Sequence, residues 1–297
     1  MQRVTQGMLN TQLLRNLNTN LNKMDNLQNQ LATGRKINKP SDDPVGISYS
    51  MRYRSELSAN DQFEKNVDSA NSWLDYTDVM LGQAGDVLQR VRELSVQGSN
   101  GTNPQSALDS IKSEIDQLYD QLVEVGNSQL NGRYIFNGQL THVAPYSKET
   151  APDVETDSVD IRFEISPGVK MVVGAKGNEV FGVPTDEDNA FRVIKDISAA
   201  LEAGDTAVVN ELIGKLDSRI EKFLEVRSDV GARSNRLELA GNRLSDLSIN
   251  LQALKSKTED ADMAEVITNL KMTENVYQSS LSAGSKLIQP SLMDYLR

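Results

Sequence analysis

Residues 209–254 read VNELIGKLDSRIEKFLEVRSDVGARSNRLELAGNRLSDLSINLQAL, and this stretch decides the fold class of the chain. Apolar side chains recur along it mostly at intervals of three, four and seven residues. They share one face of a helix: Val209, Ile213, Leu216, Ile220, Phe223, Val230, Leu237, Leu244, Leu247, Leu251 and Leu254. A seven-residue repeat held for about six heptads predicts coiled-coil packing against other helices.

Apolar stripes of the same period predict helices on both sides of this stretch. The first runs over residues 4–33 and ends at Gly34, which suits the left-handed position after a helix. A second helix is capped by Ser41 and a third by Asn103, and each is followed by proline within the first turn. Two more helices are predicted, one from about residue 188 and one after about residue 262.

A different period appears in the middle of the chain, where residues 159–165 and 169–173 alternate between apolar and polar side chains. Pro167 and Gly168 separate the two runs and predict the turn of an antiparallel hairpin. Residues 133–137 (RYIFN) predict another strand, and residues 144–158 an exposed loop.

The predicted fold is therefore mainly α. A long antiparallel helical bundle or coiled coil is built from the N- and C-terminal segments, with a small β-rich inserted domain. We expect residues 1–40 and 259–297 to form a terminal coiled-coil assembly domain, and residues 41–131 and 188–258 an α-helical bundle domain. Residues 132–187 would form a small domain that faces outward and is not needed for assembly.

Composition and charge exclude several classes of function. The 297-residue chain has a formal net charge of -11, which disfavours binding to nucleic acid or to an anionic membrane surface. It has no cysteine, so disulfides and thiolate chemistry are excluded. No apolar run has the length of about 18 residues that a membrane span needs. The N-terminal residues lack the apolar core of a secretory signal peptide, so we expect export by another route.

The chain offers no constellation of reactive side chains. His142 is the only histidine, and we expect it to be exposed to solvent. Asp42 and Asp43 follow Ser41 at a helix start, where carboxylates stabilise the helix end. Residues 259–262 (EDAD) lack the glycine and terminal glutamate of a calcium loop, so we expect helix initiation or a subunit contact there. No catalytic site, cofactor or metal is predicted, and the chain is predicted not to be an enzyme.

Four ordered motifs resemble one known family. Residues 31–45 (LATGRKINKPSDDPV) resemble the loop between the first two helices of flagellins and hook-associated proteins. Residues 88–97 (LQRVRELSVQ) resemble the end of their second helix, and residues 229–238 (DVGARSNRLE) and 259–262 resemble their C-terminal blocks. The chain is identified on these motifs as a member of the flagellin superfamily.

Two features resemble one branch of that superfamily most closely, hook-associated protein 3, which forms the hook-filament junction. They are residues 39–44 (KPSDDP) and residues 132–138 (GRYIFNG), which resemble that branch's entry into its β domain. A flagellin, or filament subunit, with a short central domain stays open as the alternative. A cytoplasmic helical adaptor is a third reading, from another functional class.

The resemblance implies a structural subunit that is exported through the flagellar type III channel without a cleaved signal peptide and assembles outside the cell. It implies a ring of identical copies, with a neighbouring hook-associated protein on the hook side and flagellin on the filament side. A cytoplasmic export chaperone would hold the C-terminal helix beforehand.

Two sets of residues are predicted to carry assembly. The apolar stripes of the terminal helices form the predicted interface: Met8, Leu14, Leu17, Leu21, Met24, Leu31, Ile267, Leu270, Tyr277, Leu281 and Leu287. The loop between the first two helices forms the second set: Gly34, Ile37, Asn38, Pro40, Asp42 and Asp43.

We predict that residues 1–35 and 262–297 are largely disordered in the free monomer and form paired helices on assembly. An isolated helix of about 30 residues is marginal in water, because most of its stability comes from burying its apolar stripe. Limited proteolysis of dilute monomer should trim both ends and leave residues 41–130 and 190–258 as a core with a cooperative melt. Protected termini in a proven monomer would contradict this prediction.

Overall fold

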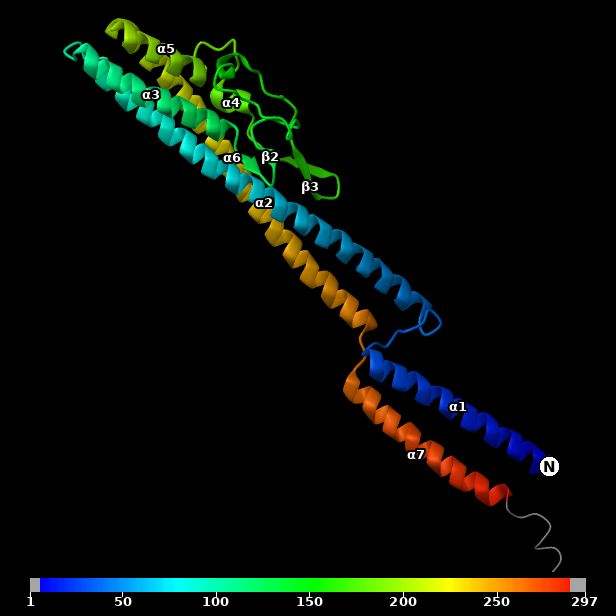
Figure 1. Cartoon of the computed structure of the whole chain (residues 1–297). Coiled ribbons are helices and arrows are strands. Elements are labelled where there is room, and N and C mark those ends of the chain that lie inside the picture. Colours follow the sequence, from blue (N-terminus) through cyan, green and yellow to red (C-terminus); the bar gives the residue numbers. More distant parts are fainter. Residues whose placement is uncertain (1–5, 289–297) are drawn as a thin grey trace, which may run out of the picture. The chain divides into compact units, whose positions relative to one another are not determined.

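The computed structural model describes residues 6–288, with side chains described over residues 7–285. The described chain is mainly helical, as predicted (Figure 1). It forms two compact units, which we call the terminal unit (Met1–Ala59, Leu247–Arg297) and the central unit (Asn60–Asp246). The predicted boundaries at residues 40 and 259 lie inside the terminal unit, so the three-domain division stays a prediction.

Helices account for most of the described residues, and two of them contribute to both units. The helices are α1 (Gln6–Thr33), α2 (Pro44–Gly98), α3 (Gln105–Gly126), α4 (Gly177–Phe181), α5 (Ala190–Ala203), α6 (Thr206–Glu259) and α7 (Met263–Ile288), with a 3-10 turn at Ala151–Asp153. The strands are β1 (Gln129–Leu130), β2 (Arg133–Tyr134), β3 (Arg162–Ser166) and β4 (Val169–Val172), paired β1 with β2 and β3 with β4, both antiparallel.

Helices α2 and α6 run antiparallel through the central unit, as polar contacts along their length show. The Asn60 side-chain amide donates to the Leu244 carbonyl at 3.0 Å. Further along, Arg227 pairs with Asp78 at 3.0 Å, and Arg92 pairs with Asp217 at 2.5 Å. Residue numbers rise on one helix as they fall on the other, so the two chain halves meet in the antiparallel bundle that the sequence predicts.

The seam between these helices is a heptad repeat on both sides. The buried positions of α2 in the central unit include Val67, Ala70, Leu74, Thr77, Leu81, Ala84, Leu88, Val91 and Ser95, with Asn60, Trp73, Val87 and Leu94 buried beside them. Those of α6 are Val209, Leu212, Leu216, Arg219, Phe223, Val230, Leu237 and Leu244. On α6 they are three or four residues apart as far as Phe223 and seven apart from there to Leu244, which confirms the predicted coiled-coil packing.

The predicted stripe is wrong at its C-terminal end, because Leu247 and Leu254 are exposed while Leu251 and Glu259 are buried. Val230, Leu237, Leu244 and Leu251 keep the seven-residue interval of the buried stripe. The positions three residues after Leu244 and Leu251 face solvent instead.

Helices α3 and α5 pack against each other and complete the bundle of the central unit (Figure 1). Asn189 caps α5, its side-chain oxygen accepting from the Arg192 amide at 3.1 Å. The predicted cap of α3 is wrong. Asn103 donates instead to the Gln97 carbonyl at 2.6 Å, and Pro104 takes the capping position without a side-chain bond.

The insertion between α3 and α5 contains two short hairpins. Asn131 (φ 53°) and Gly132 (φ 76°) form the left-handed pair that a two-residue hairpin turn requires. The predicted hairpin at residues 159–173 is confirmed, with a shorter first strand that begins at Arg162. The predicted strand at residues 133–137 ends at Tyr134, because Ile135 and Phe136 turn into the core.

The insertion shares its core with the bundle. The rings of Tyr146 and Phe181 lie 4.8 and 5.0 Å from the ring of Phe191 on α5, and Phe136 packs against Phe181 at 5.5 Å. Removing residues 140–187 would therefore uncover Phe191. It stays a prediction that this segment is not needed for assembly. Because of the shared packing, its removal should lower the stability of the central unit.

One buried cation joins the insertion to α6. Arg219 is 2% exposed and occupies a heptad position of the seam. Its Nε donates to the Asp188 carbonyl at 2.9 Å, and its guanidinium also pairs with the side chains of Asp186 and Asp188. Gly182 leaves room for it, since a Cβ there would lie 2.6 Å from the guanidinium. Burial raises the pKa of Asp188, but hydrogen bonds from Lys222 and Arg219 outweigh it and hold the pKa below its usual value.

We predict that Arg219→Ala lowers the free energy of unfolding of the central unit by about 3 kcal/mol, because it removes one partner of a buried ion pair. Chemical denaturation followed by circular dichroism measures the change. Arg92→Ala is the matched control. It breaks a half-exposed pair between α2 and α6 and should cost less than about 1 kcal/mol. Equal effects of the two substitutions would contradict the role given to Arg219.

Candidate assembly surface

The terminal helices α1 and α7 lie side by side along one seam (Figure 1). On α1 the half-buried positions are Asn10, Leu13, Leu17, Asn20, Met24, Leu27 and Leu31. On α7 the buried or half-buried positions are Val266, Leu270, Thr273, Tyr277, Ser280 and Gly284. Both sets follow the spacing of three and four residues that is typical of a coiled coil.

The seam contains polar and small side chains as well as apolar ones. Asn10 and Asn20 interrupt the apolar positions of α1, and Thr273 and Ser280 interrupt those of α7. At Gly284 the helices approach closely, since a Cβ there would lie 2.7 Å from Leu13 Cδ2. Each polar position removes roughly the 1.5–3 kcal/mol that a fully buried leucine would contribute. The pair is therefore weakly held by its own seam.

The predicted interface residues divide between two faces. Five of them line the seam within the chain: Leu17, Met24, Leu31, Leu270 and Tyr277. Five others point away from it and are exposed: Met8, Leu14, Leu21, Ile267 and Leu281. The side chain of Leu287 lies outside the described residues. The predicted set combines the two faces because adjacent leucines, Leu13 and Leu14, both fit an apolar stripe. The predicted set lacks three apolar residues of the seam: Leu13, Leu27 and Val266.

The loop between α1 and α2 is held by its own polar groups. Gly34 ends α1 with φ 68°, and its amide donates to the Gln30 carbonyl at 2.8 Å. The Asp42 carboxylate accepts from the backbone amides of Asn38 and Lys39 at 3.0 and 2.8 Å. These two bonds, that from Lys39 first, hold the pKa of Asp42 below its usual value. Pro40 lies in the turn that these bonds close.

The start of α2 differs from the prediction in its cap. Asp43 caps the helix, with its Oδ1 accepting from the amides of Val45 and Gly46 at 3.1 and 2.9 Å, and Pro44 is the first helical residue. The predicted cap, Ser41, is wrong because it lies too far from the first turn. Ile37 is buried against Gly46, where a Cβ would lie 2.6 Å from Ile37 Cδ1.

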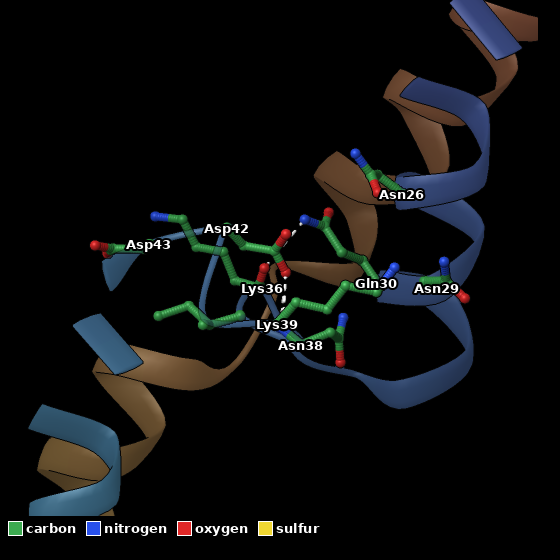
Figure 2. A pocket seen from close by; sticks show the side chains of 9 residues that line it. Asn26, Asn29, Gln30, Lys36, Asn38, Lys39, Asp42 and Asp43 are labelled. Atoms are coloured by element: carbon green, nitrogen blue, oxygen red, sulfur yellow. Dashed lines mark hydrogen bonds between the residues drawn. The ribbon is translucent and has the colours of Figure 1, made fainter. Parts of the chain in front are cut away.

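Figure 2 shows a polar hollow beside this loop, with amide and ammonium side chains around its rim. It is lined by Asn26, Asn29, Gln30, Lys36, Ile37, Asn38, Lys39, Asp42 and Asp43. The Gln30 side chain donates to the Lys36 carbonyl at 3.2 Å, which ties the last turn of α1 to the loop. Its only carboxylates, Asp42 and Asp43, are already used to hold the loop and to cap α2.

A buried carboxylate ties the loop to the break between α6 and α7. Glu259 has no exposed side-chain surface; it pairs with Arg35 at 2.7 Å and with Arg54, and accepts from Ser50 Oγ at 2.6 Å. The backbone is joined there too, since the Lys36 amide donates to the Glu259 carbonyl at 2.7 Å.

The electrostatics of Glu259 favour its charged form. Burial raises its pKa, but hydrogen bonds from Arg54 and Ser50 and the charges of Arg54 and Arg35 outweigh that effect and hold the pKa below its usual value. The sequence reading expected helix initiation or a subunit contact at residues 259–262. Helix initiation is confirmed for Asp262, whose Oδ1 accepts from the Ala264 amide at 2.9 Å. Glu259 instead ends α6, and nothing in its local sequence signals its distant partners.

The described residues hold no group of three or more histidine, cysteine, aspartate or glutamate side chains that could bind a metal ion. Within the same residues, none of the helices combines the length and the apolar composition needed to cross a membrane. What this surface offers is apolar contact area and a loop held by its own polar groups.

Family models match both ends of the chain. The bacterial flagellin N-terminal helical region matches residues 4–141, and the bacterial flagellin C-terminal helical region matches residues 213–296. The chain belongs to the flagellin superfamily.

Curated relatives of this flagellin-family protein are of two kinds. The flagellar filament 33 kDa core protein of Treponema phagedenis is 28% identical over 285 residues, which cover 94% of each chain. The flagellar hook-associated protein 3 of Escherichia coli is 27% identical over 276 residues, covering 86% of this chain and 87% of that one. The protein is thus a flagellar structural protein of the flagellin and hook-associated type, and this family is not a family of enzymes.

Solved structures share the fold. A putative flagellar hook-associated protein from Vibrio parahaemolyticus has a TM-score of 0.68 at 21% identity, covering 74% of this chain and 100% of that one. FlgL from Bacillus cereus has a TM-score of 0.60 at 22% identity, covering 69% of this chain and 99% of that one. The helical bundle with a small inserted β region is therefore confirmed. The Escherichia coli relative described above supports the closeness to hook-associated protein 3.

We predict that Glu259→Gln lowers the free energy of local opening of the α1–α2 loop by about 1.5–3 kcal/mol, the range for hydrogen bonds to charged groups. Exchange of the Lys36 amide should then be faster by about tenfold or more, measured by hydrogen exchange and mass spectrometry. Because the folded pKa lies below the unfolded one, this stability is present above the unfolded pKa and is lost as pH falls through the folded pKa. Acidification should therefore speed exchange of the Lys36 amide in the wild type and change it less in the variant. Glu238→Gln, an exposed change on the same helix, is the control and should leave exchange at Lys36 unchanged.

Proposed function

We propose that this protein forms the junction between hook and filament by self-assembly of its terminal helices. The observation that carries the proposal is the exposed apolar face of the α1–α7 pair. Leu14 is 61% exposed, and Leu21, one heptad further on, extends this face together with Ile267 and Leu281 on α7. Met8 is 63% exposed but lies about 120° round α1 from Leu14. Because the helices already cover one stripe of each other, a second stripe is left for neighbouring copies to bury.

Two motifs support the junction role over the filament role. In residues 39–44 (KPSDDP), Pro44 opens α2 directly after the capping Asp43. In residues 132–138 (GRYIFNG), Ile135 and Phe136 are buried, and Asn137 holds the following turn by donating to the Val143 carbonyl at 3.0 Å. Both stretches resemble hook-associated protein 3, and the Escherichia coli protein of that name is similar over most of its length.

The same resemblance supplies the proposed partners. Copies of this chain would form a ring, with a neighbouring hook-associated protein on the hook side and flagellin on the filament side. The subunit would leave the cell through the flagellar type III channel, after a cytoplasmic chaperone has held its C-terminal helix. A weak α1–α7 seam suits this route, because the arms are easily opened before assembly.

A filament subunit is the second candidate. The observation that favours it is the similarity to the Treponema phagedenis filament core protein, which covers 94% of both chains. A filament subunit would be needed in thousands of copies, whereas a junction needs about one ring. Purified protein that polymerises into long filaments by itself would favour this candidate.

We predict that a strain lacking this gene makes hooks without filaments and secretes unpolymerised filament protein, because the filament has nowhere to attach. Electron microscopy of the flagella and analysis of the culture medium measure both effects. Bare hooks with no filament protein in the medium would instead indicate the filament subunit.

Complementation of the same strain tests the assembly face. The wild-type gene should restore filaments, and the double substitution Leu14→Ser with Leu21→Ser should fail, because it removes apolar area that neighbours would bury. Asn18→Ser with Asn22→Ser changes exposed polar positions on the same helix and should restore filaments like the wild type. Normal filaments with the leucine variant would show that this face is not used.

A further inference from the structure

The outward face of α6 in the central unit carries two unpaired cations around a leucine. Arg236, Leu239 and Arg243 follow at intervals of three and four residues, so they lie on one side of the helix. All three are exposed, Leu239 to 71%. Neither guanidinium has an ion pair with any of the described residues. Arginine is enriched at protein interfaces relative to the rest of the surface.

The outward face of α2 in the central unit carries the opposite charges around a small side chain. Asp68, Ser72 and Asp75 follow at intervals of four and three residues, and all three are exposed. The Ser72 hydroxyl bonds back to the Asp68 carbonyl at 2.9 Å, which draws it onto the helix. Within the part of the chain that the structure describes, neither carboxylate forms an ion pair. The face thus presents a small side chain between two exposed carboxylates.

The two faces match when the helices are set antiparallel. Asp75 then meets Arg236, Ser72 meets Leu239, and Asp68 meets Arg243. The charges on each helix are seven residues apart, about 10.5 Å, so both ion pairs form in one register. The leucine fits over the serine. The same register continues outward, placing Val79 opposite Ala232.

We propose that these faces bind each other between neighbouring copies, α2 of one to α6 of the next; this deepens the proposed function, on which it rests. Both faces are exposed in one and the same chain, so their partner is a second copy. Within a chain α2 and α6 run antiparallel. Two copies that stand side by side and point in the same direction therefore present α2 and α6 to each other antiparallel, as the charge pattern requires.

Such a contact uses two different surfaces of the subunit, so each copy has one of each free for a further neighbour. A contact of this kind closes into a ring or continues as a helix, depending on the rotation between copies. The matched charges set the register and speed association, and both effects weaken as salt is added. The leucine contact supplies the apolar centre.

Engineered cross-linking in intact flagella tests the contact directly. The natural chain has no cysteine, so Ser72→Cys with Leu239→Cys introduces the only two thiols. In the proposed register their Cα atoms come within the 4.4–6.8 Å that a disulfide spans. Mild oxidation should then give a ladder of linked copies on a non-reducing gel. Val79→Cys with Ala232→Cys should give the same ladder, since that pair meets only in the antiparallel setting.

The control is Ser69→Cys with Leu239→Cys, which places one thiol at the residue after Asp68, about 100° round the helix from it, and should give no ladder. The test pairs giving no ladder, or the control giving an equal one, would overturn the proposal. A ladder is expected both in a ring and in a filament, so its absence would contradict this contact without contradicting the junction role. The gene-deletion phenotype tests the junction role separately.

A charge exchange tests the electrostatic match. Arg236→Glu with Arg243→Glu should reduce incorporation into flagella by about tenfold or more, since like charges then face each other. Adding Asp68→Arg and Asp75→Arg to that variant should restore it. Unchanged incorporation of the first variant, or no recovery in the combined one despite an unchanged melt of the purified protein, would overturn the proposal.

Discussion

The antiparallel seam between α2 and α6 is the constraint on which the rest of the fold depends. It joins the first and last thirds of the sequence, and it fixes their register through both apolar heptads and polar contacts such as Asn60 to Leu244. Helices α3 and α5 and the insertion add to the core that this seam begins. Because the seam is long and regular, it fixes the surface of α2 and α6 against which each of these elements packs.

The features that could be predicted from sequence are those with a long period. The heptads of α2 and α6 extend over many turns, so single exceptions do not obscure them. The Pro167-Gly168 turn was also predictable, since a turn of that kind depends on local backbone preferences. Caps were less predictable. Ser41, Asp42 and Asp43 are all suitable residues, and only the start of α2 at Pro44 shows which one is used.

What sequence could not supply is the pairing of residues far apart in the chain. Glu259 meets Arg35 and Arg54, and Arg219 meets Asp186 and Asp188, each across many intervening residues. Ion pairs of this kind produce no periodic pattern in the sequence. The two faces of α1 were also merged, because an apolar stripe indicates that a helix is amphipathic without telling which neighbour covers which side. In a protein built to assemble, the second neighbour is another molecule.

The close approach of α1 and α7 at Gly284 bears on how the subunit responds to the concentration of other copies. A seam with glycine and hydroxyl side chains buries less apolar surface than one of leucines, which narrows the free-energy difference between paired and separated arms. In the proposed assembly, neighbours that bind only the paired arms would stabilise that pairing by mass action. Pairing of the arms would then depend on the local concentration of the subunit.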